Sequence, residues 1–384
     1  MIKNRALLLL SLFLIVGAFL LPFLTHAPNR LISGTAYWLW NVQTRSSLVF
    51  LLPGVGLVLG SFLPQRPGVL FVLIVMATVF LAGLVHIAAA GAENLAQSAV
   101  SPAARTSFGA GFWVLITASA LMLSDLTAKA NFGPVLRVLT GFGAGLPIAA
   151  MIAAGHLDEM SIMKEYANKS DLFQASLGRH FVIVGAALVP TLLLGIPLGV
   201  VAFRRAGLGG TVLSVLNIIQ TVPSIALFGL LMAPLSALAM AVPAVKAMGI
   251  SGIGLAPAVI ALTLYSILPI VRNTAEGLAQ VPRNVVEAAI GMGMTTRQVF
   301  WKVEAPLALP VVLSGLRVTV VQAIGLAAVA ALIGAGGLGA IMFQGLFSNA
   351  LDLVLLGALP IIGIAVVTDA VFKLSVILAR RGAS

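Results

Sequence analysis

The stretch GVLFVLIVMATVFLAGLVHIAAA, residues 68–90, holds no Asp, Glu, Lys or Arg and is long enough to cross a bilayer as a helix. Of the 384 residues, 60% are hydrophobic and 9% are charged, and the mean hydropathy is +1.12. Further apolar runs, separated by charged or turn-forming residues, occupy 6–25, 45–63, 111–124, 134–155, 180–203, 211–235, 254–271, 307–332 and 353–372. We therefore predict an all-α integral membrane protein with about ten transmembrane helices.

Composition also excludes several kinds of chemistry. The chain has no cysteine, which excludes disulfides, thiolate metal sites, cysteine nucleophiles and iron–sulfur clusters. Its four histidines, at positions 26, 86, 156 and 180, have no metal-ligand spacing, and no G-x-x-x-x-G-K-[ST] motif is present to bind ATP phosphates. The net charge of +11 is scattered between apolar runs, so we expect a lipid bilayer and no nucleic acid as partner. We predict no catalytic residue and no bound metal.

The distribution of Lys and Arg predicts the orientation in the membrane. If the N-terminus is cytoplasmic and ten helices alternate, fifteen of the 22 basic residues fall on the inner side. The outer side receives the rest, Arg30, Arg45, Arg105, Lys164, Lys169, Arg179 and Lys246. By the positive-inside rule, we expect both termini in the cytoplasm. The first run also looks like a signal peptide, but Pro28 follows the small-residue exit at Ala27, so we expect it to remain as a helix.

Two hydrophilic segments interrupt the apolar pattern and suggest how the chain is divided. Residues 156–179 form an outer loop, and residues 272–306 form the longest inner loop. The outer segment is the natural boundary between two groups of spans. We therefore predict an N-terminal extension of about five transmembrane helices in residues 1–155, an extracytoplasmic linker in 156–179 and a C-terminal core in 180–384.

The inner loop carries signals for two short helices. Asn284 and Glu287 have the spacing of a capping box, and so have Thr295 and Gln298. Gly291 and Gly293 can end the first helix, and Pro306 marks the start of the next span. The apolar side of these helices is predicted to consist of Val286, Ala289, Ile290, Phe300 and Trp301. Such a segment either docks in a groove of a partner or serves only as a connector, and composition leaves both open.

This segment resembles the EAA signature of ATP-binding-cassette (ABC) importer permeases. The signature has Glu-Ala-Ala, a following Gly, and then a hydrophobic residue, any residue, Leu and Pro; this chain departs from it at Ala305, where the pattern has Leu. In that family the segment is the coupling helix, which occupies a groove of the ATPase subunit. The resemblance therefore implies that the residues that couple this chain to an ATPase are Asn284, Glu287, Ala288, Ala289, Gly293, Val303 and Pro306.

The resemblance extends over residues 178–375 to the betaine, carnitine and choline permeases of the osmoprotectant branch. The matching stretches are IPLGV (196–200), NIIQTVPSIALFGLL (217–231), PAVIALTLYSILPIVRNT (257–274), EAAIGMGMT (287–295) and IGAGGLG (333–339). The N-terminal extension is similar to that of the longer, low-affinity glycine betaine type. The resemblance implies a type I ABC importer core (MetI-like) in the bacterial inner membrane, which carries an osmoprotectant such as glycine betaine into the cytoplasm.

The same resemblance implies the partners. They are an ATPase dimer that binds ATP and Mg²⁺, a second permease chain that is identical or related, and an extracytoplasmic solute-binding protein. No cofactor is expected in this chain itself. Aromatic residues are only 7% of the chain and show no cage for a quaternary ammonium, which fits recognition by the binding protein.

Polar residues within apolar runs are candidates for the translocation path. A group in the run 211–235 forms either a gate or a structural kink: Gln220, Thr221, Pro223 and Ser224. Arg317 faces the path or snorkels toward headgroups, while Asp369 and Lys373 are spaced for an ion pair on one helix. The G-x-G-x-x-G match at 334–339 follows an apolar run of membrane length, so we reject dinucleotide binding.

Two other functions stay open at this point. An ion-gradient-driven secondary transporter of a small polar solute needs carboxylates near mid-membrane, and only Asp369 comes close. A structural or assembly protein of the membrane would transport nothing. Dependence of uptake on ATP, or on an ion gradient, separates these alternatives.

Overall fold

A computed structural model describes residues 3–29, 32–42, 47–99, 101 and 103–382. The chain folds as two compact units, Met1–Asn168 and Lys169–Ser384. The segment predicted as an outer linker, 156–179, is mostly helical, because it contains one short helix and the first turns of a long one.

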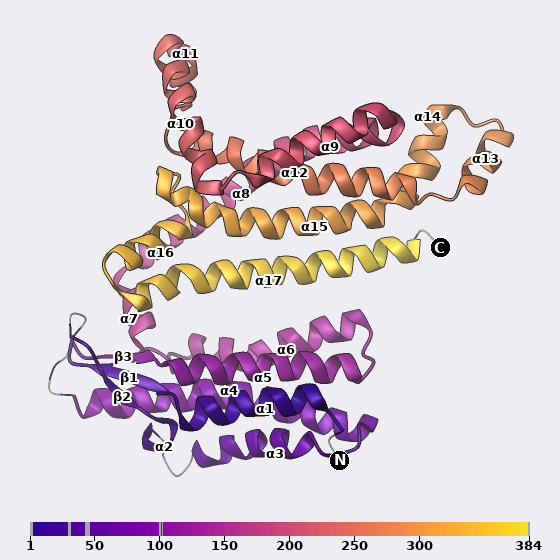
Figure 1. Cartoon of the computed structure of the whole chain (residues 1–384). Helices are drawn as coiled ribbons and strands as arrows, with labels where there is room; N and C mark the ends of the chain where they lie inside the picture. The colour runs from indigo at the N-terminus through magenta and orange to yellow at the C-terminus, as the bar shows by residue number, and fades with distance from the viewer. Residues whose placement is uncertain (1–2, 30–31, 43–46, 100, 102, 383–384) are drawn as a thin grey trace. The chain divides into compact units, whose positions relative to one another are not determined.

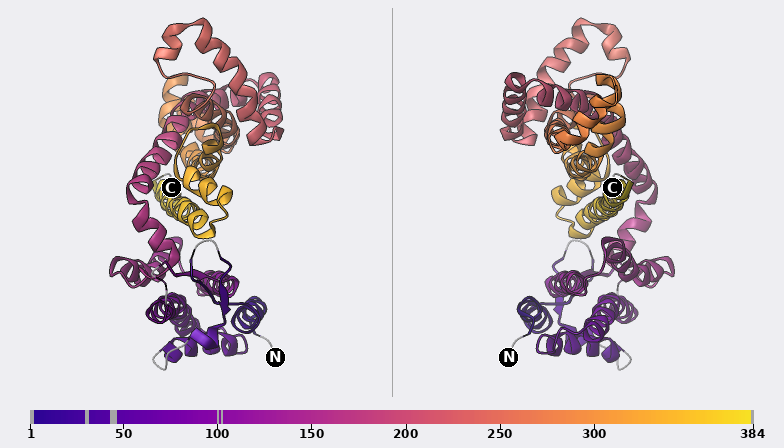
Figure 2. Two further views of the ribbon diagram at one scale, coloured as in Figure 1. Left: turned by 90° about the vertical axis from the view of Figure 1, so that its left-hand side faces the viewer. Right: turned by 90° about the vertical axis from the view of Figure 1, so that its right-hand side faces the viewer.

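The N-terminal unit is a bundle of roughly parallel helices with a small antiparallel sheet at one end (Figures 1 and 2). Its elements are α1 (Arg5–Phe19), β1 (Leu24–Ala27), β2 (Thr35–Tyr37), α2 (Leu39–Val42), the 3₁₀ helix η1 (Ser47–Leu51), α3 (Leu52–Gly60), α4 (Pro67–Gln97), β3 (Arg105–Phe108), α5 (Ala110–Lys129), α6 (Pro134–Ala153) and α7 (Ser161–Asn168). The sheet has the order β2-β1-β3, with Leu24 opposite both Tyr37 and Phe108. It is an addition to the predicted all-α fold, made of strands too short to give a clear sequence pattern.

Polar contacts join the start of α1 to the end of α5. Asn4 caps α1, because its Oδ1 accepts from the amide of Leu7 at 3.0 Å. The Asn4 amide also donates to Asp125 of α5 at 3.0 Å, and the Lys129 ammonium donates to Asn4 at 2.5 Å and to Asp125 at 2.7 Å. These groups satisfy one another, so α1 and α5 are held at their ends as well as by apolar packing.

The C-terminal unit is built on long helices that lie side by side, with a pair of short helices extending beyond their ends (Figure 1). Its elements are α8 (Ser170–Arg204), α9 (Ala206–Thr221), α10 (Ser224–Ala241), α11 (Pro243–Ala247), α12 (Leu255–Ala279), α13 (Arg283–Gly291), α14 (Thr296–Val299), the π-helical turn η2 (Phe300–Glu304), α15 (Ala305–Val329), the 3₁₀ helix η3 (Ala330–Ile333), α16 (Leu338–Phe347) and α17 (Leu351–Gly382).

Small residues let these helices approach closely. A Cβ atom added at Gly199 of α8 would lie 2.5 Å from the Cβ of Thr274 on α12, a distance that real Cβ contacts do not show. Alanines fill much of the buried core, as at Ala187, Ala261 and Ala327. Close packing of small side chains is what joins helices in a bilayer, where lipid offers no hydrophobic advantage to larger ones.

Eight helices in the described part of the chain are long and apolar enough to cross a membrane: α4, α5, α6, α8, α10, α12, the continuous helix Thr296–Ile333, and α17. The first two of the ten predicted runs give shorter helices, α1 and η1–α3; α1 ends early because Pro22 follows it. The run 211–235 breaks into α9 and α10 at Pro223. The predicted inner loop starts later than expected, since α12 continues to Ala279.

Candidate functional site: the coupling segment

The short helices α13 and α14, together with η2, form a segment that we call the coupling segment, residues 283–304. It extends beyond the ends of α12 and α15 (Figure 1). The end of α13 has both bonds of a Schellman motif, from the amide of Gly293 to the Ile290 carbonyl at 2.9 Å and from Met294 to Ala289 at 3.1 Å. Gly293 has φ +85°, the left-handed conformation that this motif requires. The predicted glycine turn is confirmed.

The next residues start α14 with the predicted capping box. The Thr295 amide donates to Gln298 Oε1 at 2.8 Å, and the Gln298 amide donates to Thr295 Oγ1 at 3.4 Å. Only Met294 separates the left-handed Gly293 from this cap. The joint between α13 and α14 is therefore specified at both sides by hydrogen bonds, and it sets the direction of one helix relative to the other.

The first predicted capping box is wrong. Helix α13 starts at Arg283, its N-cap residue is Pro282, and no side chain caps it. Asn284 therefore lies within the first turn, where its side chain does not precede the helix amides that a cap must satisfy. Both Asn284 and Glu287 are exposed, so the Glu287 carboxylate is directed to solvent and not to a cap.

The apolar residues of the coupling segment face two ways, where one apolar side was predicted. Val286 and Phe300 pack into a small core with the ends of the long helices, and Ala289 is buried. In contrast, Ile290, Met292 and Trp301 are 59%, 73% and 64% exposed. An isolated exposed apolar residue is ordinary, but three large ones on one short projecting segment are unusual for a chain by itself.

A π-helical turn joins the segment to the next long helix. The amide of Ala305 bonds to the carbonyl of Phe300, five residues earlier. Pro306 explains the turn, because it has no amide to bond the Lys302 carbonyl and its ring would clash with that carbonyl in a regular α-helix. Pro306 thus lies in the first turn of α15, as predicted for the start of the next span, but the helix is continuous through it from Thr296.

The ends of several long helices meet the coupling segment in one apolar cluster. Its buried members are Leu278, Val281 and Ala308, and the partly buried residues packed against them are Val200, Phe203, Val286, Phe300 and Leu307. Beside this cluster, the carboxylate of Glu304 forms a salt bridge with Arg204 at the end of α8. The sequence analysis did not single out Glu304. The available signal was a lone carboxylate among apolar residues just before Pro306.

The candidate path residues of the run 211–235 lie at the break between α9 and α10. Gln220 donates to the carbonyl of Tyr265 on α12 at 2.8 Å, and the Tyr265 hydroxyl donates in return to the carbonyl of Val222. The carbonyl of Val222, which lies in the break just before Pro223, is thus hydrogen-bonded by a side chain of α12. Thr221 bonds within its own helix to Ile218 at 2.7 Å. Ser224 begins α10 and is partly exposed.

Arg317 lies elsewhere, on α15, and its guanidinium contacts the carboxylate of Asp369 on α17 at 2.5 Å. Asp369 also pairs with Lys373 at 2.8 Å, which confirms the predicted ion pair on that helix. The carboxylate that a secondary transporter would need is therefore neutralised by two cations. Across the described ranges, no group of three or more His, Asp or Glu side chains could hold a metal ion.

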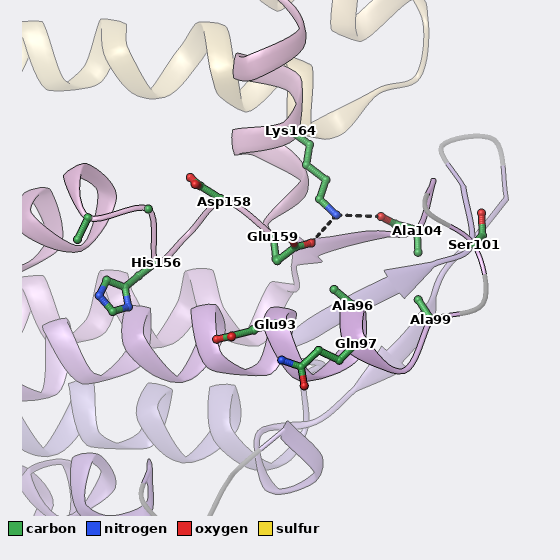
Figure 3. A pocket seen from close by; sticks show the side chains of 12 residues that line it. Glu93, Ala96, Gln97, Ala99, Ser101, Ala104, His156, Asp158, Glu159 and Lys164 are labelled. Carbon is green, nitrogen blue, oxygen red and sulfur yellow. Dashed lines mark hydrogen bonds and ion pairs between the residues drawn. The ribbon is translucent and has the colours of Figure 1, made fainter.

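A large hollow of about 710 Å³ lies in the N-terminal unit, between the end of α4 and the turn after α6. Figure 3 shows Lys164 directed toward the Glu159 carboxylate and the Ala104 carbonyl, which it contacts at 2.7 and 3.3 Å. Glu93 and Asp158 line the same hollow and are exposed. Solvated carboxylates around an open hollow need no ligand to stabilise them.

Comparison with known proteins gives the family. Residues 191–378 match the family described as binding-protein-dependent transport system inner membrane component, and residues 3–163 match the N-terminal domain of the ABC transporter permease YehY. The osmoprotectant import permease protein OsmW of Salmonella typhimurium is 41% identical over 205 residues, which are 53% of this chain and 90% of that protein. The chain belongs to this family of ABC importer permeases.

Other proteins resemble the same part of the permease. The choline transport system permease protein OpuBB of Bacillus subtilis is 38% identical over 196 residues, 51% of this chain and 83% of that protein. The carnitine transport permease protein OpuCD of Listeria monocytogenes is 36% identical over 205 residues, 53% and 85%. A solved structure of the MetNI methionine ABC transporter in inward-facing conformations is 24% identical and covers 55% of this chain and 98% of that chain, with a TM-score of 0.48.

The predicted family and the match of the N-terminal extension are confirmed. The permease is a membrane-spanning subunit of an ABC importer with a MetI-like core. ATP hydrolysis in such importers belongs to a separate subunit, so this permease is a transport subunit and not itself an enzyme.

Proposed function

We propose that this permease moves an osmoprotectant such as glycine betaine, carnitine or choline into the cytoplasm of a bacterium. The substrate class is supported by relatives named for osmoprotectant, choline and carnitine transport, which match about half of the chain. Two facing ATPase subunits bind ATP and Mg²⁺, and a solute-binding protein delivers substrate at the outer face. One ATPase dimer offers two docking grooves, so a second permease chain, identical or related, completes the path.

We infer coupling to an ATPase from the exposed apolar residues of the coupling segment. Ile290, Met292 and Trp301 are too exposed to stabilise this chain by packing within it. A groove on an ATPase subunit would remove them from water and gain roughly 25 cal/mol for each Å² of apolar area buried. Glu287 and Ala288, exposed on the same helix, would contact the rim of the groove.

The other predicted coupling residues have supporting roles in this proposal. Ala289 is buried, Val303 is partly buried, Gly293 forms the joint, Pro306 induces the π-helical turn, and Asn284 is exposed at the start of α13. In the same proposal the permease core occupies 180–384 after the linker 156–179, while residues 1–155 have a role still to be assigned. Both termini and the coupling segment face the cytoplasm, as the distribution of basic residues predicts.

The break between α9 and α10 is the proposed gate. Residues Gln220, Thr221, Pro223 and Ser224 gather there, and the break is held by two hydrogen bonds between α9–α10 and α12. Movement of α12 would therefore change the backbone of the break directly. Arg317 is proposed to position α15 against α17 through Asp369, close to the path but outside the gate.

A charge reversal tests the coupling. Glu287→Lys should abolish ATP-driven uptake of labelled glycine betaine, carnitine or choline in proteoliposomes while the chain still inserts in the membrane. In this proposal the exposed Glu287 carboxylate would meet the ATPase subunit, and a reversed charge there would oppose docking. Glu276→Lys is a matched control, since Glu276 is an exposed carboxylate of α12 outside the coupling segment. Normal uptake by Glu287→Lys would refute the assignment. Uptake that persists without ATP but requires an ion gradient would favour the secondary transporter.

A further inference from the structure

The Arg204–Glu304 salt bridge joins the last residue of α8 to the last residue of the π-helical turn. Nη2 of Arg204 contacts Oε2 of Glu304 directly. The Glu304 side chain is only 6% exposed, whereas that of Arg204 is 42% exposed. The pair therefore consists of a buried carboxylate and an arginine that enters from the surface.

The surroundings make the carboxylate depend on this partner. The apolar cluster described above contributes Phe203 from α8 and Phe300 from the π-helical turn. The Arg204 guanidinium also lies over the Phe203 ring, 5.5 Å from its centroid. A carboxylate buried beside such residues loses hydration and is stable only with a matching charge. The salt bridge is thus selective for one alignment of α8 with the turn.

Among the described residues, Val200 and Phe203 of α8 share the apolar cluster with Val286 and Phe300 of the coupling segment. Apolar contacts of this kind are not directional. Such contacts let one helix slide or rotate past another with little change in buried area. A salt bridge has a short range and a defined direction, so it resists that movement. Glu304 is also covalently the junction where the coupling segment becomes α15. Displacement of the segment therefore reaches α15 through the backbone and α8 through the Arg204–Glu304 salt bridge.

We propose that Arg204 and Glu304 are positioning residues of the transport cycle: their salt bridge makes α8 move together with the coupling segment when the ATPase subunits close. This inference rests on the proposed function, because it assumes that the segment is driven by an ATPase. It assigns no contact with the ATPase or with substrate to either residue. Its prediction is uncoupling, in which ATP hydrolysis continues while transport falls.

The test uses the full permease assembled with its ATPase and binding protein in proteoliposomes. Arg204→Gln and Glu304→Gln each remove the salt bridge, and Glu304→Gln leaves no buried charge. We expect uptake per molecule of ATP hydrolysed to fall on the order of tenfold in both, within the range that loss of a coupling contact gives. Arg205→Gln is the matched control, because Arg205 is exposed and its side chain has no bonded partner among the residues that the structure describes.

The double variant Arg204→Glu/Glu304→Arg should recover part of the uptake that each single change loses, because it restores the pair with reversed charges. The inference is overturned if Glu304→Gln transports like Arg205→Gln, or if ATP hydrolysis and uptake fall by the same factor. It is also overturned if both single variants and the reversed pair fail to assemble, since the pair would then serve stability alone. Failure of the proposed function is seen separately, as normal uptake by Glu287→Lys.

Discussion

Replacement of Gly293 by alanine tests whether the joint between α13 and α14 must be rigid. Gly293 has φ +85°, and no atom lies within 4 Å of an added Cβ, so the whole cost is conformational. A residue with a side chain loses about 1–2 kcal/mol in the left-handed conformation. That energy lowers the population of molecules in which this joint is formed, relative to those in which it is not, by roughly 5- to 30-fold.

Gly291→Ala is the matched control, two residues away. Gly291 is the last residue of α13, and an added Cβ there also meets no atom within 4 Å. Alanine at a helical position is favoured over glycine by about 0.5–1 kcal/mol, so this variant should keep its uptake. Gly293→Asn should fall between the two, because asparagine tolerates the left-handed region better than alanine.

The assay is ATP-driven uptake of labelled glycine betaine by the reconstituted complex, with the amount of assembled complex measured in parallel. We expect Gly293→Ala to lose most of its uptake at an unchanged level of assembly, since the joint is exposed and remote from the helix core. Equal uptake by Gly293→Ala and Gly291→Ala would refute the reasoning. The orientation of α13 would then be determined by the docking partner and not by the Schellman motif.

Two further predictions concern orientation and pH. The chain has no cysteine, so a single introduced cysteine can be labelled specifically. Met292→Cys should react with a membrane-impermeant maleimide only in inverted vesicles, and His156→Cys only in right-side-out vesicles. The reverse pattern would refute a cytoplasmic coupling segment. Burial, and then the nearby Lys164, hold the pKa of His26 below its ordinary value of 6.5. As the pH falls, the histidine of the unfolded chain therefore takes up a proton before that of the folded chain. The N-terminal unit should lose stability as the pH falls below 6.5. Thermal unfolding between about pH 5 and 8 measures this slope, which His26→Gln should reduce; an unchanged slope would show that other groups cause it.

Patterns that are local in the chain predicted their structures well. The apolar run at 68–90 became part of α4, and the spacing of Thr295 and Gln298 gave the observed capping box. The left-handed glycine at 293 and the break at Pro223 were also expected from residue type alone. Each depends on backbone geometry within a few residues, so no knowledge of distant contacts was needed.

Where a local pattern competed with another local signal, the prediction was wrong. The spacing of Asn284 and Glu287 permits a capping box, but Pro282 starts the helix earlier and leaves Asn284 inside it. The apolar residues of the coupling segment were placed on one side, while Ile290 and Trp301 are exposed. The sequence distinguishes an apolar residue from a polar one, but it does not show which of two apolar faces the neighbouring helices cover.

The sequence by itself determined that the chain crosses a membrane, where most of its long helices lie and which segment carries the EAA signature, because bilayer thickness and helix capping act over consecutive residues. Only the tertiary structure decided that Glu304 meets Arg204 and that Gln220 and Tyr265 hold the break in place. These contacts join residues 43 to 100 positions apart in the chain. A charge or an amide in an apolar run has many potential partners, and the packing of helices selects one of them.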